Sequence, residues 1–316
     1  FTIGGLFLFC FTFGVQYRHL LAFLFFCSRI RINLIKNNHL IEEASMFKNT
    51  FGILLALIWA TVNFTGEVKA EKIIEHKEFK ENFKAYQTGT FIVFDEAQNQ
   101  YQVFNNKQSK KRVSPDSTFQ IFLSLAGLEA GILDSKDENT FMKWDGAPQP
   151  FALWRKDQTL SSATYGSVVW YFQGIANQIG EKKMKEFLKE IGYGNQKISR
   201  EFSTFWIQSS LAISPKEQVD LLYRTYSNQL KIKPENLEIL RKNITFHNKH
   251  GLRIMGQTGS ALSGQNGWYV GWVEKGGNRY FFTTYIAGMK GSEKADGANA
   301  RIITLELLDQ LGITSN

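Results

Sequence analysis

Hydrophobic and polar residues follow two different periods along this chain, and the period changes twice. β-Branched and aromatic residues fill 88–95 and 100–104 on either side of a polar turn, which predicts a β-hairpin. Similar runs occupy 252–258, 267–274 and 280–287, and a glycine-rich turn joins the last two. Between these two groups, apolar residues recur at helical spacing. Helices are expected at 117–130, 163–179, 181–191, 215–226 and 234–242.

Two further amphipathic helices are predicted near the ends of this pattern, at 71–83 and 298–311. Strands at both ends with helices between them indicate an α+β fold. We expect an antiparallel sheet closed by N- and C-terminal pieces, flanked by terminal helices, with a helical lobe inserted. A cleft between the lobe and the sheet is the expected place for a site.

Residues 1–70 are predicted to lie outside this fold. Met46 begins a pattern typical of a secretory signal peptide at 46–70, with an apolar stretch at 51–61 and a small-residue cleavage site ending at Ala70. Residues 1–45 are then an upstream or membrane-proximal segment, and 71–316 form the domain. In the alternative interpretation, residues 1–65 contain one or two membrane spans. If residues 1–65 are not retained, we expect an exported protein, periplasmic or secreted, with no membrane association.

Charge and cysteine content exclude some classes of function. The net charge is +8, but lysines such as Lys182 and Lys183 stand beside acidic residues such as Glu181, which indicates a solvated basic surface and no nucleic-acid partner. Both cysteines, Cys10 and Cys27, precede the predicted domain. The mature domain therefore has no disulfide and no zinc–thiolate site, and no metal is expected.

Ser117 is the candidate nucleophile because it stands at the start of an apolar, helix-compatible run. A hydroxyl there lies at the positive end of the helix dipole, and the serine N–H is free to bind an oxyanion. Gln120, three residues later, lies on the same face. In the serine–lysine acyl-transfer motif that position holds lysine. The alternative is that Ser117 only caps the helix.

Four further stretches follow Ser117 at characteristic separations. They are Ser167-Val168-Val169, Tyr193-Gly194-Asn195, Trp206 within an aromatic run, and Gln257-Thr258-Gly259-Ser260. In this order they resemble the class D serine β-lactamases and the related penicillin-sensing domains of receptors that switch on β-lactam resistance. The resemblance covers about 88–312 and implies a β-lactamase/transpeptidase-like fold. Each stretch alone also has an ordinary structural explanation: a small packing residue, a helix stop, a core tryptophan and a strand end.

The resemblance implies a role for each of these residues. Ser117 would attack the lactam carbonyl to form an acyl-enzyme, and the N–H groups of Ser117 and Ser260 would hold the oxyanion. Ser167 would relay the proton to the leaving nitrogen. Thr258 and Gly259 would line the strand along which the antibiotic lies. Trp206 would donate a hydrogen bond to the general base, and Tyr193 would support the site. Arg301 would bind the ligand carboxylate. Arg301 could also be a surface cation, and Ala300 aligns about as well.

Two departures fall on the chemistry itself. The family has lysine at the positions of Gln120 and Gln257, and carbon dioxide carboxylates the first lysine to form the general base. An amide cannot be carboxylated and is not a base near pH 7. No substitute base is evident, because His247 and His250 are expected on the surface in a polar turn. No cofactor is expected.

We therefore expect a class D-like serine β-lactamase whose hydrolysis is weak or lost. Its partner would be a β-lactam antibiotic or a cell-wall peptide. The alternatives are a non-hydrolytic sensor or decoy domain that binds penicillin, and a DD-peptidase, which would also need the lysine.

The signal-peptide pattern generates a first prediction. Cleavage after Ala70 should give a mature N-terminus at Glu71 and a soluble exported protein. N-terminal sequencing of the exported form checks this. Retention of Met46, or recovery only in detergent extracts, would contradict it.

Overall fold

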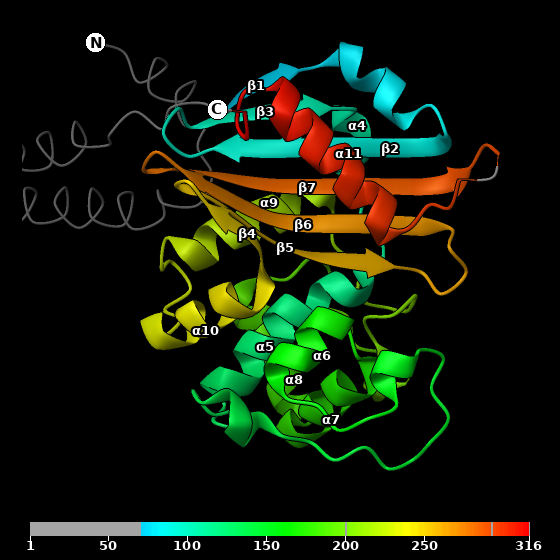
Figure 1. Cartoon of the computed structure of the whole chain (residues 1–316), viewed down its shortest axis with the longest axis vertical. Coiled ribbons are helices and arrows are strands. Elements are labelled where there is room, and N and C mark those ends of the chain that lie inside the picture. Colours follow the sequence, from blue (N-terminus) through cyan, green and yellow to red (C-terminus); the bar gives the residue numbers. More distant parts are fainter. Residues whose placement is uncertain (1–70, 200, 292, 316) are drawn as a thin grey trace, which may run out of the picture. The chain divides into compact units, whose positions relative to one another are not determined.

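A seven-stranded sheet, in the order β1-β3-β2-β7-β6-β5-β4, organises the protein (Figure 1). The computed structural model describes residues 71–199, 201–291 and 293–315, so the segments predicted at 1–45 and 46–70 lie outside the described residues. The strands are β1 (Lys72–Glu75), β2 (Tyr86–Asp95), β3 (Gln100–Phe104), β4 (Thr245–Lys249), β5 (Leu252–Ser260), β6 (Asn266–Lys275) and β7 (Asn278–Met289).

The inner strands confirm the predicted antiparallel sheet. β2 forms the expected hairpin with β3 and pairs on its other side with β7, where Phe91 lies opposite Thr284. This pairing joins the N-terminal and C-terminal parts of the chain. β6 and β7 each contain at least six consecutive buried residues, because both faces of the sheet are covered.

The start of the domain differs from the prediction. Residues 71–83 were expected to form one amphipathic helix, but they form strand β1 followed by the 3-10 helix η1 (Lys77–Phe83). β1 runs parallel to β3, and the N–H of His76 donates to the carbonyl of Val103 at 2.7 Å. The unpaired edge of β3 supplies hydrogen-bond partners, which here outweigh the helical preference of a short segment.

Helices cover both faces of the sheet. Figure 1 shows α11 across one face, α9 on the other, and the remaining α-helices of the lobe gathered beyond β5. The α-helices are α4 (Asn106–Ser109), α5 (Gln120–Glu129), α6 (Leu160–Gly166), α7 (Val169–Ile179), α8 (Glu181–Ile191), α9 (Pro215–Tyr226), α10 (Pro234–Ile244) and α11 (Gly297–Gln310). The remaining 3-10 helices are η2 (Asp116–Phe119), η3 (Asp137–Thr140), η4 (Ala152–Trp154) and η5 (Phe202–Thr204). Within the described ranges, no helix has the length and apolar character needed to cross a bilayer.

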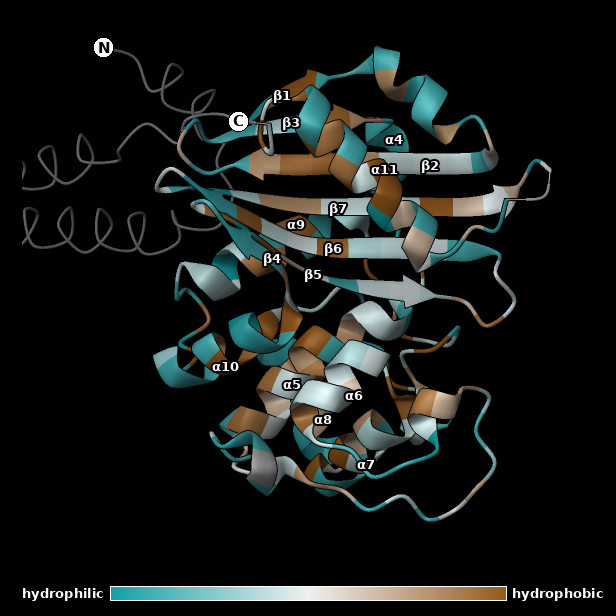
Figure 2. Cartoon of the chain, viewed as in Figure 1, coloured by the Kyte–Doolittle hydropathy of each residue, from teal (hydrophilic) through white to brown (hydrophobic). Residues whose placement is uncertain are grey.

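Two apolar cores lie on the two sides of the sheet. The larger core joins the sheet to the lobe and contains Phe119, Phe122 and Trp206, all fully buried. The smaller core lies beneath α11 and η1 and includes Tyr269 and Leu307. Figure 2 shows the corresponding apolar segments in α5 and α7, whereas α10 is largely hydrophilic.

The helix expected at 163–179 is two helices. α6 ends at Gly166, Ser167 takes the left-handed conformation with φ of 49°, and α7 begins at Val169. The N–H of Val168 then donates back to the carbonyl of Ala163 at 2.9 Å, which satisfies a carbonyl at the end of α6. The sequence predicted one continuous helix because apolar residues recur at helical spacing on both sides of this break.

Strand β4 was also missed. His247 was expected in a polar turn, but it lies in this edge strand opposite Ile254, and only His250 lies in the turn. β4 has one large apolar residue, Phe246, which is half exposed. An edge strand needs few apolar residues, so its sequence pattern is weak.

The close approach of β5 and β6 generates a second prediction. A Cβ atom on Gly271 would lie 1.9 Å from the carbonyl oxygen of Met255, a backbone atom that cannot move without shifting the strand. Gly271→Ala should therefore destabilise the domain by about 1–3 kcal/mol or more. Gly174→Ala is the matched control in α7, because its Cβ would meet only the flexible side chain of Met142. Equal unfolding free energies for the two variants would contradict this account.

Candidate active site

Ser117 lies where the sequence predicted, immediately before a buried helix. It is half buried in η2, and η2 continues directly into α5. The carbonyl of Pro115 accepts from both the N–H and the hydroxyl of Thr118, at 3.2 and 2.7 Å. The first turn is therefore a tight 3-10 turn fixed at both ends, and Gln120 begins the α-helix one turn after Ser117.

Three predicted residues from distant parts of the chain meet at one amide oxygen. The Ser167 hydroxyl donates to Gln120 Oε1 at 3.1 Å, and Gln257 Nε2 donates to the same oxygen at 3.3 Å. Gln120 and Gln257 are 1% and 5% exposed. The left-handed conformation of Ser167 displays its hydroxyl at the break between α6 and α7. These contacts join α5, the lobe and β5 through neutral groups.

Several buried polar atoms on the turn that carries Ser117, and on residues packed against it, lack a hydrogen-bond partner in the described part of the chain. Four of the nine such atoms belong to the nucleophile turn and its surroundings: Asp116 Oδ2, Gln120 Nε2, the Tyr193 hydroxyl and Trp206 Nε1. Trp206 packs 6.0 Å from Phe119, centroid to centroid. Burial raises the pKa of Tyr193 well above its usual range, so its hydroxyl remains protonated.

The site does not fit a carboxylated base. Carbon dioxide reacts with an amine, and Gln120 offers only an amide nitrogen, which is not a nucleophile of that kind. The N–H groups of Gln120 and Trp206 are both donors without an acceptor. We therefore assign no step in the mechanism to a carbamate.

Strand β5 passes directly against the nucleophile turn. A Cβ atom on Gly259 would lie 3.1 Å from the carbonyl oxygen of Pro115 and 3.2 Å from the N–H nitrogen of Thr118, so glycine permits this approach. Thr258 is half buried beside it, and Ser260 is exposed. The Ser260 hydroxyl accepts from the N–H of Gly297 at 2.9 Å, which fixes the start of α11 to this strand.

Arg301 lies away from this point of contact. Its guanidinium sits over the ring of Phe246 on β4, 4.9 Å from the centroid. The residue of α11 that approaches Thr258 is Gly297, whose added Cβ would lie 2.7 Å from Thr258 Cβ. Ala300, the other candidate, is fully buried. Ala300 has no charge and the guanidinium of Arg301 lies over Phe246, so the carboxylate-binding role of Arg301 stays a prediction.

Asp116 is a site residue that sequence reasoning missed. It directly precedes Ser117, is 1% exposed and has φ of 47°. Its Oδ1 accepts from the N–H of Gln208 at 3.2 Å, and burial raises its pKa to about 6. An acidic residue at the start of an apolar helix was the available signal, but an acidic side chain is also ordinary in a first helical turn.

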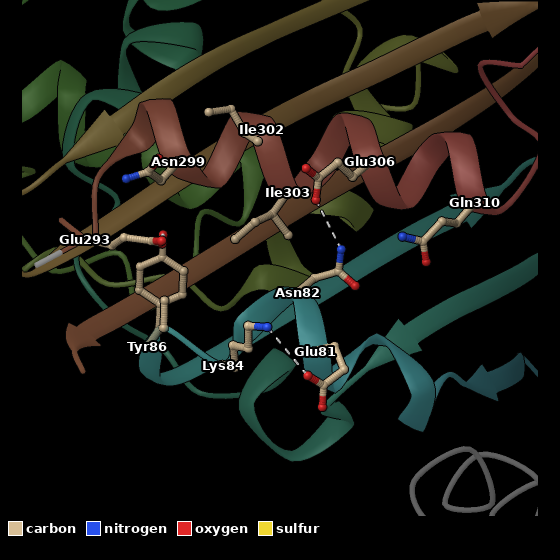
Figure 3. Close-up of a pocket in the computed structure, with 11 residues that line it drawn as sticks. Glu81, Asn82, Lys84, Tyr86, Glu293, Asn299, Ile302, Ile303, Glu306 and Gln310 are labelled. Carbon is tan, nitrogen blue, oxygen red and sulfur yellow. Dashed lines mark hydrogen bonds and ion pairs between the residues drawn. The ribbon is translucent and has the colours of Figure 1, made fainter. Parts of the chain in front are cut away.

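A separate hollow of about 740 Å³ lies between η1 and α11, on the face away from the lobe (Figure 3). Its lining includes Glu81, Glu293 and Glu306, and Glu306 accepts from Asn82 at 3.2 Å across it. None of the predicted site residues lines it. An acidic lining alone does not identify a ligand, so the residues around Ser117 remain the candidate active site.

Comparison with known proteins identifies the family. Residues 76–309 match the family described as the penicillin binding protein transpeptidase domain. The regulatory protein BlaR1 of Bacillus licheniformis is 36% identical over 244 residues, covering 76% of this chain and 40% of BlaR1. The match therefore covers less than half of the length of that relative.

Solved structures agree with this match. The C-terminal domain of the Bacillus licheniformis BlaR penicillin-receptor superposes with a TM-score of 0.72 and 33% identity, covering 78% of this chain and 99% of that domain. The class D β-lactamase BAT-2 gives a TM-score of 0.69 and 33% identity, covering 75% and 97%. The chain therefore belongs to the penicillin-binding protein transpeptidase family, and its relatives are class D β-lactamases and penicillin-sensor domains.

Proposed function

We propose that residues 71–316 form a class D-like domain that binds β-lactams at Ser117 and whose hydrolytic activity is impaired or absent. One observation carries this proposal: the buried group one turn after Ser117 is the amide of Gln120, and its oxygen is already occupied by donors from Ser167 and Gln257. The resemblance implies lysine at both glutamine positions.

The chemistry of acyl transfer explains why this matters. Attack by Ser117 Oγ on a lactam carbonyl requires an acceptor for the hydroxyl proton, and Gln120 cannot act as a base near pH 7. Loss of a positioned base typically lowers the rate by about 10²–10⁴. Gln257 is neutral as well, so the cation that the resemblance implies before Thr258 is missing, and Arg253 on the same strand is paired with Glu274.

The groups needed for recognition remain. Ser117 is accessible at the start of the turn, and β5 approaches it closely at Gly259. In the proposed complex the antibiotic lies along Thr258 and Gly259, and the N–H groups of Ser117 and Ser260 receive the carbonyl oxygen. The arrangement therefore supports binding more than turnover.

The second candidate is a non-hydrolytic sensor or decoy, which binds penicillin or a cell-wall peptide and is acylated slowly or not at all. It is favoured by the similarity to a penicillin-receptor domain. A DD-peptidase would also need the missing base. A sensor, a decoy and a DD-peptidase would all act outside the cytoplasm. This location agrees with the export that we predict for the domain.

Binding without turnover is the third prediction. We expect millimolar penicillin affinity, about −4 kcal/mol. Intact mass after minutes of incubation should show little or no penicilloyl adduct, because no base activates the hydroxyl. Ser117→Ala provides the baseline mass. A rapid stoichiometric adduct, absent in Ser117→Ala, would show that another base operates.

Rescue of hydrolysis is the fourth prediction. Gln and Lys have comparable reach, and the apolar start of α5 should lower the pKa of an introduced amine enough for carbon dioxide to react. Penicillin hydrolysis should rise in Gln120→Lys and rise further in Gln120→Lys with Gln257→Lys, and bicarbonate should stimulate both. The gains should be non-additive, because the two groups serve one network.

A control separates this effect from added charge alone. Gln108 is buried to the same extent as Gln257 but lies in α4, outside the contact of Ser167 with Gln120, so Gln108→Lys should gain no hydrolysis. A folded double variant that hydrolyses no penicillin in bicarbonate would contradict the proposed enzyme ancestry and favour the sensor.

A further inference from the structure

Asp116 occupies an unfavourable position immediately before the nucleophile. Its φ of 47° lies in the left-handed region, which non-glycine residues seldom adopt, and its side chain is 1% exposed. Backbone strain and buried charge both cost stability, so the surrounding structure must impose this conformation. Such features cluster at functional sites.

The carboxylate connects the nucleophile turn to the loop that carries Trp206. Asp116 Oδ1 accepts from the N–H of Gln208 at 3.2 Å and from the hydroxyl of Ser114 at 3.3 Å. The same hydroxyl lies 3.0 Å from the carbonyl oxygen of Trp206, so its single proton is shared between these two acceptors. Gln208 is left-handed as well, with φ of 44°. Two strained residues are therefore hydrogen-bonded directly to each other.

Within the described residues, the groups that act on this carboxylate or respond to its charge are neutral. Tyr193, which follows α8, and Tyr285 on β7 are close enough for the negative charge of Asp116 to raise their pKa. Burial is the larger cause, and it raises the pKa of Tyr285 to about 12. Asn266 at the start of β6 and the N–H of Gln208 stabilise the charged form, but burial dominates and raises the pKa of Asp116 to about 6. Glu217 on α9 acts on Tyr193 and is paired with Arg112.

The sign of the resulting pH dependence follows from linkage. The folded-state pKa of about 6 is above the ordinary value of 3.8. Between these two values the folded protein binds more protons than the unfolded chain, so this group lowers stability as pH rises through that window. Above pH 6 the fold therefore holds a destabilising negative charge beside Ser117.

We propose that Asp116 is a positioning residue whose negative charge holds the Trp206–Gln208 loop against the nucleophile turn and so orients Ser117 for ligand capture. Hydrogen bonds to a charged acceptor are about twice as strong as neutral ones. Protonation of the carboxylate, or its replacement by an amide, therefore loosens the contact. The inference rests on the proposed function and adds a residue to that same site.

The test compares penicillin affinity from pH 4.5 to 8 in the unaltered domain, Asp116→Asn and Asp95→Asn. Affinity of the unaltered domain should fall about threefold to tenfold as pH falls through 6, the size expected for one weakened hydrogen bond. Asp116→Asn should bind weakly at every pH. Asp95 is the matched control, because it is a buried carboxylate at the far end of β2 that accepts from Gln98 and Asn278. Asp95→Asn should keep the fall in penicillin affinity near pH 6.

Thermal denaturation supplies a second readout. Asp116→Asn should raise Tm at pH 7, and the difference should close toward pH 4, because the variant lacks the destabilising charge. A flat affinity profile for the unaltered domain, or an Asp116→Asn variant that keeps the fall in penicillin affinity near pH 6, overturns the inference and leaves the proposed function standing. Absence of binding at every pH overturns both. If Asp116→Asn does not fold, the pH profile of penicillin affinity in the unaltered domain decides whether the inference stands.

Discussion

One buried amide oxygen, Gln120 Oε1, joins the helical lobe to the sheet at the active site. Ser167 reaches it from the break between α6 and α7, and Gln257 reaches it from β5. Every member of this contact is neutral, so the contact itself needs no compensating charge to be stable. The same neutrality removes the base that acyl transfer requires. In the proposed function, the neutral contact that stabilises this junction is also the reason why hydrolysis is impaired or absent.

The sequence predicted most of the fold because its periodic segments are bounded by clear signals. α8 and α9 match their predicted ranges, since glycines flank α8 and Pro215 opens α9 after a capping box. The misses were β1, β4 and the break at Ser167. An edge strand has few apolar residues, so it gives little periodic signal. A left-handed residue inside a continuous apolar pattern does not interrupt that pattern, so the break is not visible in the sequence.

Three residues that meet in the candidate site were named from the sequence, but Asp116 and the electrostatics of the site were not. The order of the motifs anticipated that Ser167, Gln120 and Gln257 would converge. Burial of Asp116 against the Trp206 loop depends on segments that are about 90 residues apart, and local pattern does not encode it. The direction of Arg301 likewise depends on how α11 is rotated on the sheet, which places its guanidinium over Phe246.

Turnover of a chromogenic cephalosporin by the unaltered domain tests the central claim most directly. A neutral amide one turn after Ser117 predicts hydrolysis that is absent, or about 10²–10⁴ slower than in the variant with Gln120→Lys and Gln257→Lys, with or without bicarbonate. Turnover by the unaltered domain as fast as in that variant, and lost in Ser117→Ala, would contradict the account, because it would require a fully functioning base at this site.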